Sequence, residues 1–259
     1  MKVDIHICSF YKHFNYLFYC LKSIVKFTEG FNSVKLFIPD RDIDLFYSKV
    51  TDDIKPYLGN FIDIITFKEW ENKGMLHHEY IVCNADTYST DADCILHFDS
   101  DCIFTNTMNA NEFIEDNKLI QIYTPYETLI KIQPNYINWK IAVESCLGWS
   151  PENEFMRTSF LIYRKELYKL TRHLIEKHTN SSLEEYVKKQ RNEFPQTFAE
   201  YNTLGEVAWK FYNKDYFWLN TNEFVPEKIW ERDRKIRRMW SHRDPTHEDM
   251  EIFNKLGLT

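Results

Sequence analysis

Short apolar segments that resemble strands alternate with segments of helical periodicity in the first part of the chain, and this alternation limits the fold more than any other feature of the sequence. The strand-like segments are 3–8, 33–39, 61–67 and 93–98. The spacing of apolar residues predicts a helix over 14–27 and another over about 74–88, and Asp40 to Asp44 offer N-cap candidates for a short one. Strands that alternate with helices predict an α/β fold with a mainly parallel sheet flanked by helices.

The remainder of the chain is less regular. Its strand-like segments are 119–123, 159–163 and 216–220, and its helical segments are 164–178 and 197–213. The stretch from Thr124 to Ser150 fits neither pattern, and Pro125 and Pro134 within it favour loops.

No segment has the composition of a linker between domains. The chain of 259 residues contains only 6 Gly and 8 Pro, and they do not gather with Ser into a flexible stretch. This length is sufficient for one large α/β domain with a substantial core. We therefore predict a single domain over 1–259.

The charge balance argues against a nucleic-acid partner. The chain has 32 basic and 39 acidic side chains, which gives a formal net charge of −7. Proteins that bind nucleic acids usually have a broad basic face, which this composition does not favour. One basic cluster occurs near the C-terminus: Arg232, Arg234, Lys235, Arg237, Arg238 and Arg243. Apolar residues interrupt it, so it is typical of an amphipathic segment with a solvated face, from which one or two cations could neutralise a diphosphate.

The six cysteines contain no CxxC pair and mostly lie in apolar runs, so we expect buried free thiols and a reducing compartment. Asp4 interrupts the first apolar run, where a signal peptide would need a continuous apolar core. No apolar run is long enough to span a membrane. From these features we expect a cytoplasmic, soluble protein.

The clearest chemical signal is a pair of aspartates that follows the fourth strand-like segment. Asp99 and Asp101 stand two residues apart, between the apolar runs of 95–98 and 102–104. Ligands of open α/β sheets bind beyond the carboxyl ends of the strands. Two carboxylates there could hold Mg²⁺ or Mn²⁺, which prefer oxygen ligands and often share them with substrate phosphates. The alternative interpretation is an ordinary acidic turn.

The order of the segments up to Asp99-Ser100-Asp101 resembles the nucleotide-diphospho-sugar transferases of the GT-A fold. The run that begins at Gly74 also resembles a group of bacterial and viral glycosyltransferase-like proteins, with His77 and His78 in place of two Gln. The resemblance implies a UDP-sugar or similar donor, a carbohydrate or other hydroxyl acceptor, and Mn²⁺ or Mg²⁺ bound by the aspartates. It also implies a nucleotide-sugar-binding half, 1–105, and a half that binds the acceptor and completes the metal site, 106–259.

Three later segments resemble the same group: 156–165, 198–202 and 240–242. The resemblance implies that His242 completes the metal site with Asp99 and Asp101. It also implies that Glu200 is the general base of an inverting transfer, with Glu193 and Glu206 as the fallback candidates. The alternative interpretation of Glu200 is an acidic residue in the first turn of a helix, stabilised there by the helix dipole.

The residues after the first two strand-like segments are candidates for contact with the donor. Ser9, Phe10 and Tyr11 stand where enzymes of the GT-A fold hold the nucleotide base, and an aromatic ring there could stack on uracil. Asp40 could contact the ribose or base, or it could be an N-cap. Ser100 would lie beside the donor with Asp99.

Two other classes of protein fit part of the pattern. A phosphatase of the haloacid-dehalogenase type also carries an apolar strand followed by Asp-x-Asp, although there the motif normally follows the first strand. A catalytically inactive module that binds a sugar or a nucleotide could be built on the same fold.

Overall fold

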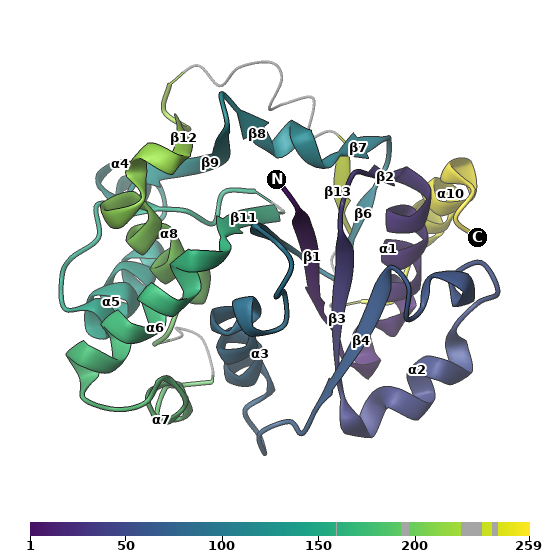
Figure 1. Cartoon of the computed structure of the whole chain (residues 1–259), viewed down its shortest axis with the longest axis horizontal. Helices are drawn as coiled ribbons and strands as arrows, with labels where there is room; N and C mark the ends of the chain where they lie inside the picture. The colour runs from purple at the N-terminus through teal and green to yellow at the C-terminus, as the bar shows by residue number, and fades with distance from the viewer. Residues whose placement is uncertain (159, 193–196, 224–234, 240–242) are drawn as a thin grey trace. The chain divides into compact units, whose positions relative to one another are not determined.

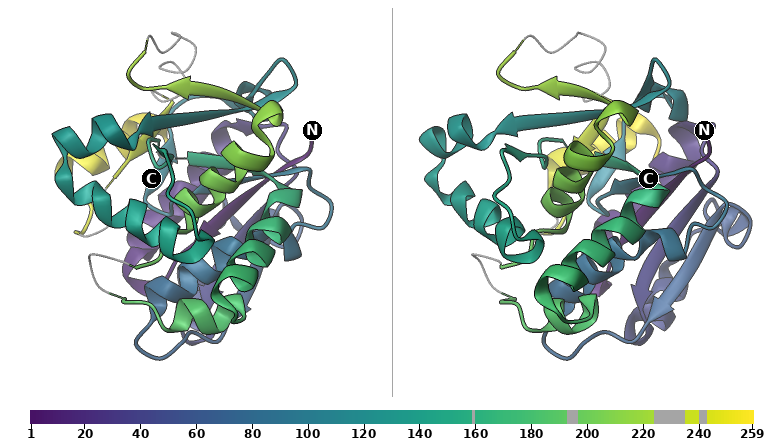
Figure 2. Two further views of the ribbon diagram at one scale, coloured as in Figure 1. Left: turned by 90° about the vertical axis from the view of Figure 1, so that its left-hand side faces the viewer. Right: turned by 60° about the vertical axis from the view of Figure 1, so that its left-hand side comes forward.

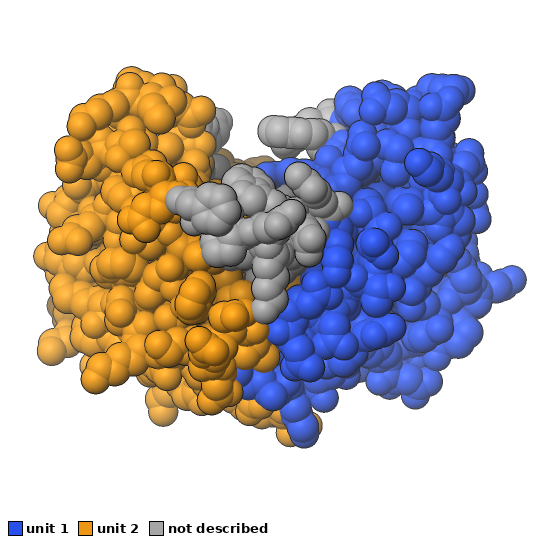
Figure 3. All heavy atoms as spheres, turned by 90° about the horizontal axis from the view of Figure 1, so that it is seen from above, with its two compact units in different colours: residues 1–68, 96–112, 226–259 blue, residues 69–95, 113–225 orange. Residues whose placement is uncertain are grey.

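The computed structural model describes residues 1–158, 160–192, 197–223, 235–239 and 243–259 (Figure 1). Contacts within the chain divide it into two compact units, each assembled from separate stretches of sequence (Figure 3). Unit 1 comprises 1–68, 96–112 and 226–259, and unit 2 comprises 69–95 and 113–225. Among the described residues, no helix is both long enough and apolar enough to cross a membrane.

Parallel strands form the centre of unit 1. They are β1 (Val3–Cys8), β3 (Ser33–Pro39) and β4 (Ile62–Phe67). β3 pairs with β1 on one side and with β4 on the other, parallel in both cases. β5 (Cys94–Phe98), whose last residues belong to this unit, neighbours β1 in the sheet. The predicted strands and the mainly parallel sheet of an α/β fold are therefore confirmed.

Helices and short strands surround this sheet in unit 1. The helices are α1 (Phe14–Phe27), α2 (Ile43–Lys49) and α10 (His247–Leu256). The short strands are β2 (Thr28–Glu29), β6 (Cys102–Phe104), β7 (Met108–Asn109) and β13 (Ile236–Arg238). β6 pairs antiparallel with β13, and β2 pairs parallel with β7.

A hydrophobic cluster joins α1, β6, α10 and the residue that follows β13. Tyr16 of α1, Ile103 of β6, Met239 after β13, and Phe253 of α10 are all at most 2% exposed and pack together. The ring of Tyr19 on α1 stacks on that of Phe253, with 3.8 Å between ring centroids. Burial of this much apolar surface stabilises the association of the C-terminal segment with α1 and β6.

Unit 2 has its own sheet and its own set of helices (Figure 2). The strands of this sheet are β8 (Ile114–Glu115), β9 (Lys118–Pro125), β10 (Asn153–Glu154) and β12 (Tyr216–Asn220). The unit also contains β11 (Phe160–Arg164), which neighbours β5 instead. Its helices are α3 (Gly74–Cys83), α4 (Tyr126–Ile132), α5 (Ile137–Leu147), α6 (Lys165–Thr179), α7 (Leu183–Lys188) and α8 (Glu200–Phe211). β9 pairs parallel with β12 and antiparallel with β8 and β10.

Single turns of 3-10 helix connect several elements. They are η1 (Tyr11–His13), η2 (Asp40–Asp42), η3 (Lys55–Tyr57), η4 (Ala85–Thr87), η5 (Ala110–Phe113), η6 (Pro134–Tyr136) and η7 (Asn213–Asp215). The predicted helix over 74–88 thus consists of α3 and η4.

The prediction of loops between Thr124 and Ser150 was wrong, because α4 and α5 occupy much of this stretch. Pro125 is the N-cap residue of α4, and Pro134 is the first residue of η6. Proline is tolerated at the start of a helix, where its missing N–H would have no partner in any case. Both prolines therefore mark where helical segments begin.

Helix α8 lies close to β10 because of a glycine. A Cβ atom at Gly205 would overlap the ring of Phe155, which is fully buried. We expect Gly205→Ala to lower the free energy of unfolding by about 1–3 kcal/mol, because overpacking exceeds the gain in helix propensity. Urea unfolding measures this, with Lys169→Ala at an exposed position of α6 as the control. A stabilised Gly205→Ala protein would contradict the close packing of α8 on Phe155.

Candidate functional site

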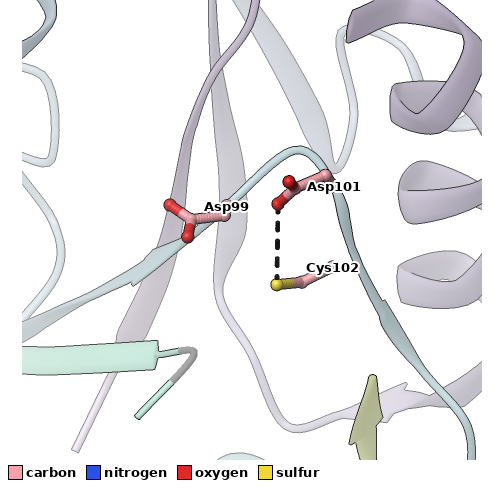
Figure 4. Close-up of side chains that lie close together, drawn as sticks. All are labelled: Asp99, Asp101 and Cys102. Carbon is pink, nitrogen blue, oxygen red and sulfur yellow. Dashed lines mark hydrogen bonds between the residues drawn. The ribbon is translucent and has the colours of Figure 1, made fainter. Parts of the chain in front are cut away.

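The turn after β5 carries the aspartate pair. The backbone N–H of Cys102 donates to the carbonyl oxygen of Asp99 over 3.0 Å, which closes the turn. Ser100 and Asp101 are 4% and 8% exposed, whereas the side chain of Asp99 is 38% exposed. In Figure 4 the side chains of Asp101 and Cys102 point toward each other. The turn therefore presents one carboxylate close to solvent and one that is nearly buried.

β13 fixes this turn through backbone hydrogen bonds. The N–H of Met239 donates to the carbonyl oxygen of Asp101 over 2.8 Å. At the other end of the short ladder, the N–H of Thr105 donates to the carbonyl oxygen of Lys235 over 2.7 Å. Since these bonds involve only the backbone, a change of the Asp101 side chain leaves their donors and acceptors in place. The residues on either side of β13 thus support the turn.

A cation from β13 lies beside the exposed carboxylate. The ladder register places Arg238 opposite Cys102, and the guanidinium of Arg238 lies 3.3 Å from Asp99 Oδ2. Burial among surrounding atoms raises the pKa of Asp99 to about 6, Arg238 opposes this shift, and the charge of Asp101 adds to it. Because the Asp99 side chain is more than one-third exposed, solvent screens these interactions and their effect on stability is small.

Two thiols complete the surroundings of the turn. The Sγ of Cys102 lies 3.9 Å from Asp101 Oδ1, and that of Cys20 on α1 lies 3.9 Å from the carbonyl oxygen of Asp99. Both cysteines are fully buried. Burial and the two aspartate charges raise the pKa of both thiols well above the usual range. All six cysteines are free, and five are buried, as expected from the sequence.

The residues at the turn fit a hard divalent cation. One ligand atom each from Asp99, Asp101 and Cys102 can be chosen so that the three lie within 4.8 Å of one another. In the described part of the chain this is the group of His, Cys, Asp and Glu with metal-binding geometry. Mg²⁺ and Mn²⁺ bind one or two carboxylates and take their remaining ligands from water and phosphate. A cation would also relieve the repulsion between the two aspartates.

Strand β1 lies beside β5, the strand that leads to this turn. His6 of β1 and His97 of β5 are buried, and their ring centroids are 5.7 Å apart. Burial and the charge of Lys35 lower the pKa of His6 to about 3, so it remains neutral. Ser9 follows β1 and is 5% exposed, and among the described residues its Oγ has no hydrogen-bond partner.

Phe10 and Tyr11 differ in exposure. The ring of Phe10 packs against that of His13 with 4.3 Å between centroids, whereas Tyr11 is 45% exposed. The backbone N–H of Tyr11 donates to Asp42 Oδ2 over 3.1 Å. Asp42 was not among the predicted site residues, although its carboxylate fixes the start of η1. Of the aromatic candidates, Tyr11 presents the more accessible ring.

Asp40 does not act as a helix cap. It is the first residue of η2, it is exposed, and neither η2 nor α2 has a side-chain cap hydrogen bond. The capping interpretation is therefore wrong, since Pro39 occupies the N-cap position of η2. A contact between Asp40 and a nucleotide stays a prediction.

Most described members of the basic cluster are paired with acids of the same unit. Lys235 lies 2.7 Å from Glu112, and Arg237 lies 3.1 Å from Glu248. Arg243 lies 2.7 Å from Asp249. These pairs neutralise the cluster locally, and Arg238 is the member that lies at the aspartate turn. The sequence predicted that one or two cations of this segment could lie at the site, but it did not identify Arg238 as one of them.

Glu200 lies in unit 2 and is only 7% exposed. It is the first residue of α8, which packs against α3 in this unit. Burial, and then the charge of Glu200, raise the pKa of Glu79 on α3 well above its usual range. Glu79 is 5% exposed, and among the described residues its Oε2 has no hydrogen-bond partner. Nothing in the sequence pattern identified Glu79 as a neighbour of Glu200.

His77, which precedes the aspartate turn in sequence, and Glu206, a fallback candidate for the general base, have different surroundings. His77 is 6% exposed, and its ring stacks on that of Trp70. Its Nδ1 accepts a hydrogen bond from the backbone N–H of Trp70 over 3.0 Å. This is a structural role, and burial lowers its pKa to about 4. Glu206 accepts from Trp149 Nε1 over 2.9 Å. The predictions for Glu193 and His242 concern positions outside the described residues.

Comparison with known proteins adds no assignment. No protein-family model matches this chain, and no curated protein matches it in sequence. A function must therefore be argued from the turn itself and from the motifs that surround it.

The buried pair of Glu79 and Glu200 in unit 2 makes the free energy of unfolding depend on pH. The folded state keeps a proton on Glu79 at pH values above 4.5, the ordinary pKa of a glutamate, while the unfolded state releases it. Stability should therefore fall as the pH rises above this value, by up to about 1.4 kcal/mol per pH unit. We expect Glu79→Gln, which mimics the protonated acid, to make the free energy of unfolding less dependent on pH.

Urea unfolding at several pH values measures this dependence. Glu144→Gln, at an exposed position of α5, is the matched control and should keep the slope of the wild-type protein. An unchanged slope in Glu79→Gln would contradict the retention of a proton by the buried pair.

Proposed function

We propose that this chain is a metal-dependent glycosyltransferase that moves a sugar from a nucleotide-diphosphate donor, with UDP-sugar as the first candidate, to a carbohydrate or other hydroxyl acceptor. The observation that carries the proposal is the aspartate turn, where Asp99 and Asp101 come within metal-binding distance directly after β5. Support also comes from the parallel sheet of unit 1 and from the resemblance of the motifs to transferases of the GT-A fold.

Each group at the turn has a definite part in this proposal. Asp99 and Asp101 would hold Mn²⁺ or Mg²⁺. The ion, when bound, acts as a Lewis acid that neutralises the diphosphate leaving group. Arg238 provides a second positive charge next to Asp99, whereas Arg237 and Lys235 pair with Glu248 and Glu112. An acidic protein can thereby offer an anionic donor a local site of positive charge.

The segment after β1 is the proposed site of the nucleotide base. Tyr11 has an exposed ring at the start of η1, and its backbone is fixed by Asp42. Stacking on an aromatic ring does not require a specific base, and contributes about 1–3 kcal/mol per base in single-stranded nucleic-acid complexes. Ser9 Oγ, which is buried, could contribute a hydrogen bond.

The first test of the proposed function is a thermal-shift screen of nucleotide-sugars with and without Mn²⁺. A ligand at about 100 times its dissociation constant stabilises the folded state by about 2.7 kcal/mol, which corresponds to a rise of about 5–10 °C in Tm. We expect this rise only when Mn²⁺ and the nucleotide are both present. Asp101→Asn should abolish it, since the backbone bond to Met239 that supports the turn does not involve the side chain.

Asp91→Asn, at an exposed position before β5, is the matched control and should behave as the wild-type protein. An equal shift with nucleotide in EDTA would contradict the proposal. Binding without sugar transfer to any acceptor would favour an inactive module, and hydrolysis of p-nitrophenyl phosphate would favour a phosphatase.

A second test concerns Glu200 as the general base of an inverting transfer. Base catalysis by a carboxylate typically contributes about 10²–10⁴-fold to the rate. We expect Glu200→Gln to lower the transfer rate within this range and to leave the affinity for the donor unchanged. The measurement compares product formation with donor binding, and Glu144→Gln, at an exposed position of α5, is the matched control that should keep the wild-type rate. Near-normal turnover, or a product with the anomeric configuration of the donor, would exclude Glu200 as this base.

A further inference from the structure

The aspartate turn has a potential ligand that the proposed transferase does not use. Cys102 is the first residue of β6 and is fully buried, and its Sγ points at Asp101 Oδ1 from 3.9 Å. Mg²⁺ and Mn²⁺ favour oxygen ligands and have little preference for sulfur. The potential metal ligands at the turn are therefore two carboxylates and one thiol, and a hard cation would not need the thiol.

The distances allow all three groups to bind one ion. Metal–oxygen bonds to carboxylates are about 2.0–2.2 Å and zinc–sulfur bonds about 2.3 Å, so two ligands of one ion can lie about 4 Å apart. The ligand atoms of Asp99, Asp101 and Cys102 already lie within 4.8 Å of one another. A small rotation of the side chains would bring them to binding distance, and the backbone of the turn could stay in place.

A second thiol lies at the same turn. Cys20 belongs to α1, far from Cys102 in sequence, and its Sγ lies 3.9 Å from the carbonyl oxygen of Asp99. Thiols from two separate elements thus approach the turn, together with its two carboxylates. Sulfur ligands favour thiophilic ions such as Zn²⁺ and Cd²⁺.

We propose that the turn also binds a thiophilic divalent cation, such as Zn²⁺ or Cd²⁺, through Asp99, Asp101 and the sulfur of Cys102. Binding breaks the S–H bond of Cys102 and forms a sulfur–metal bond, and the proton goes to solvent. The metal keeps its oxidation state, so the step needs no oxidant or reductant. Because the carboxylates are shared, such an ion competes with Mn²⁺ and would inhibit a transferase that depends on Mn²⁺. Only this last consequence rests on the proposed function.

The test is a titration of the full chain with Cd²⁺, followed through the ultraviolet charge-transfer absorbance of the sulfur–cadmium bond. We expect a band that saturates at equimolar ion and that Mn²⁺ in large excess diminishes. Cys102→Ser should lose the band and bind Cd²⁺ more weakly by at least the about 10–100-fold that the loss of an outer-shell partner costs, because a direct ligand is removed. Cys8→Ser is the matched control, because Cys8 is the one cysteine that is not buried, and this variant should keep the band.

A second variant keeps the test decisive if Cys102→Ser does not fold. Asp101→Asn retains the thiol but loses a carboxylate ligand, so the band should require at least about 10–100-fold more Cd²⁺, the cost of losing even an outer-shell partner. A band that is lost in Cys8→Ser, or that is unchanged in Cys102→Ser or in Asp101→Asn, would overturn the inference. If the band behaves as expected but no nucleotide-sugar binds with Mn²⁺, the metal site stands and the proposed transferase function falls.

Discussion

Backbone hydrogen bonds between the turn after β5 and the chain around β13 hold the candidate site in place. They connect Met239 to Asp101 and Lys235 to Thr105, and the buried cluster around Phe253 supports them. Two carboxylates at this turn repel each other by up to a few kcal/mol at a few ångströms, and solvent at Asp99 reduces this. A turn that is fixed by its backbone can tolerate such repulsion, because local side-chain contacts do not have to stabilise it.

Arg238 is the compensating charge for this arrangement. It belongs to β13, and the residues on either side of β13 make the backbone bonds, so the support of the turn and its electrostatic balance come from one short segment. Its guanidinium lies where a divalent ion would also be attracted. Asp99 can therefore interact with the guanidinium or with a metal ion. A metal ion bound there would share Asp99 with Arg238 or displace Arg238 from it.

The buried glutamates of unit 2 differ from the aspartates of the turn in how their charge is compensated. Glu154 is fully buried and forms an ion pair with Arg157, whereas Glu206 accepts one hydrogen bond from Trp149. Burial raises the pKa of Glu206 to about 7. Glu79 has the charge of Glu200 as its neighbour, and Glu200 belongs to the helix that the motif resemblance singled out. Groups of this kind are common at functional sites, although structural networks also produce them.

The strand pattern of the first part of the chain was sufficient to predict β1, β3, β4, β5 and the position of the aspartate turn. These segments are short apolar runs whose type depends mainly on local periodicity. The pattern around Pro125 and Pro134 did not predict helices, because proline both interrupts helices and begins them, and tertiary context decides which. Arg238 could not be chosen among its basic neighbours, since its role depends on a pairing between distant strands. Glu79 could not be identified for a similar reason, because its acidic neighbour Glu200 lies on a helix far along the chain.

The proposed function depends on the joint binding of a divalent cation by Asp99 and Asp101. The most direct measurement is anomalous X-ray diffraction from crystals of the protein grown with Mn²⁺ and UDP. We expect an anomalous peak bounded by the carboxylates of Asp99 and Asp101, with the diphosphate of UDP completing the coordination. A protein with bound UDP but no manganese peak at the turn, or with its manganese bound elsewhere, would contradict it.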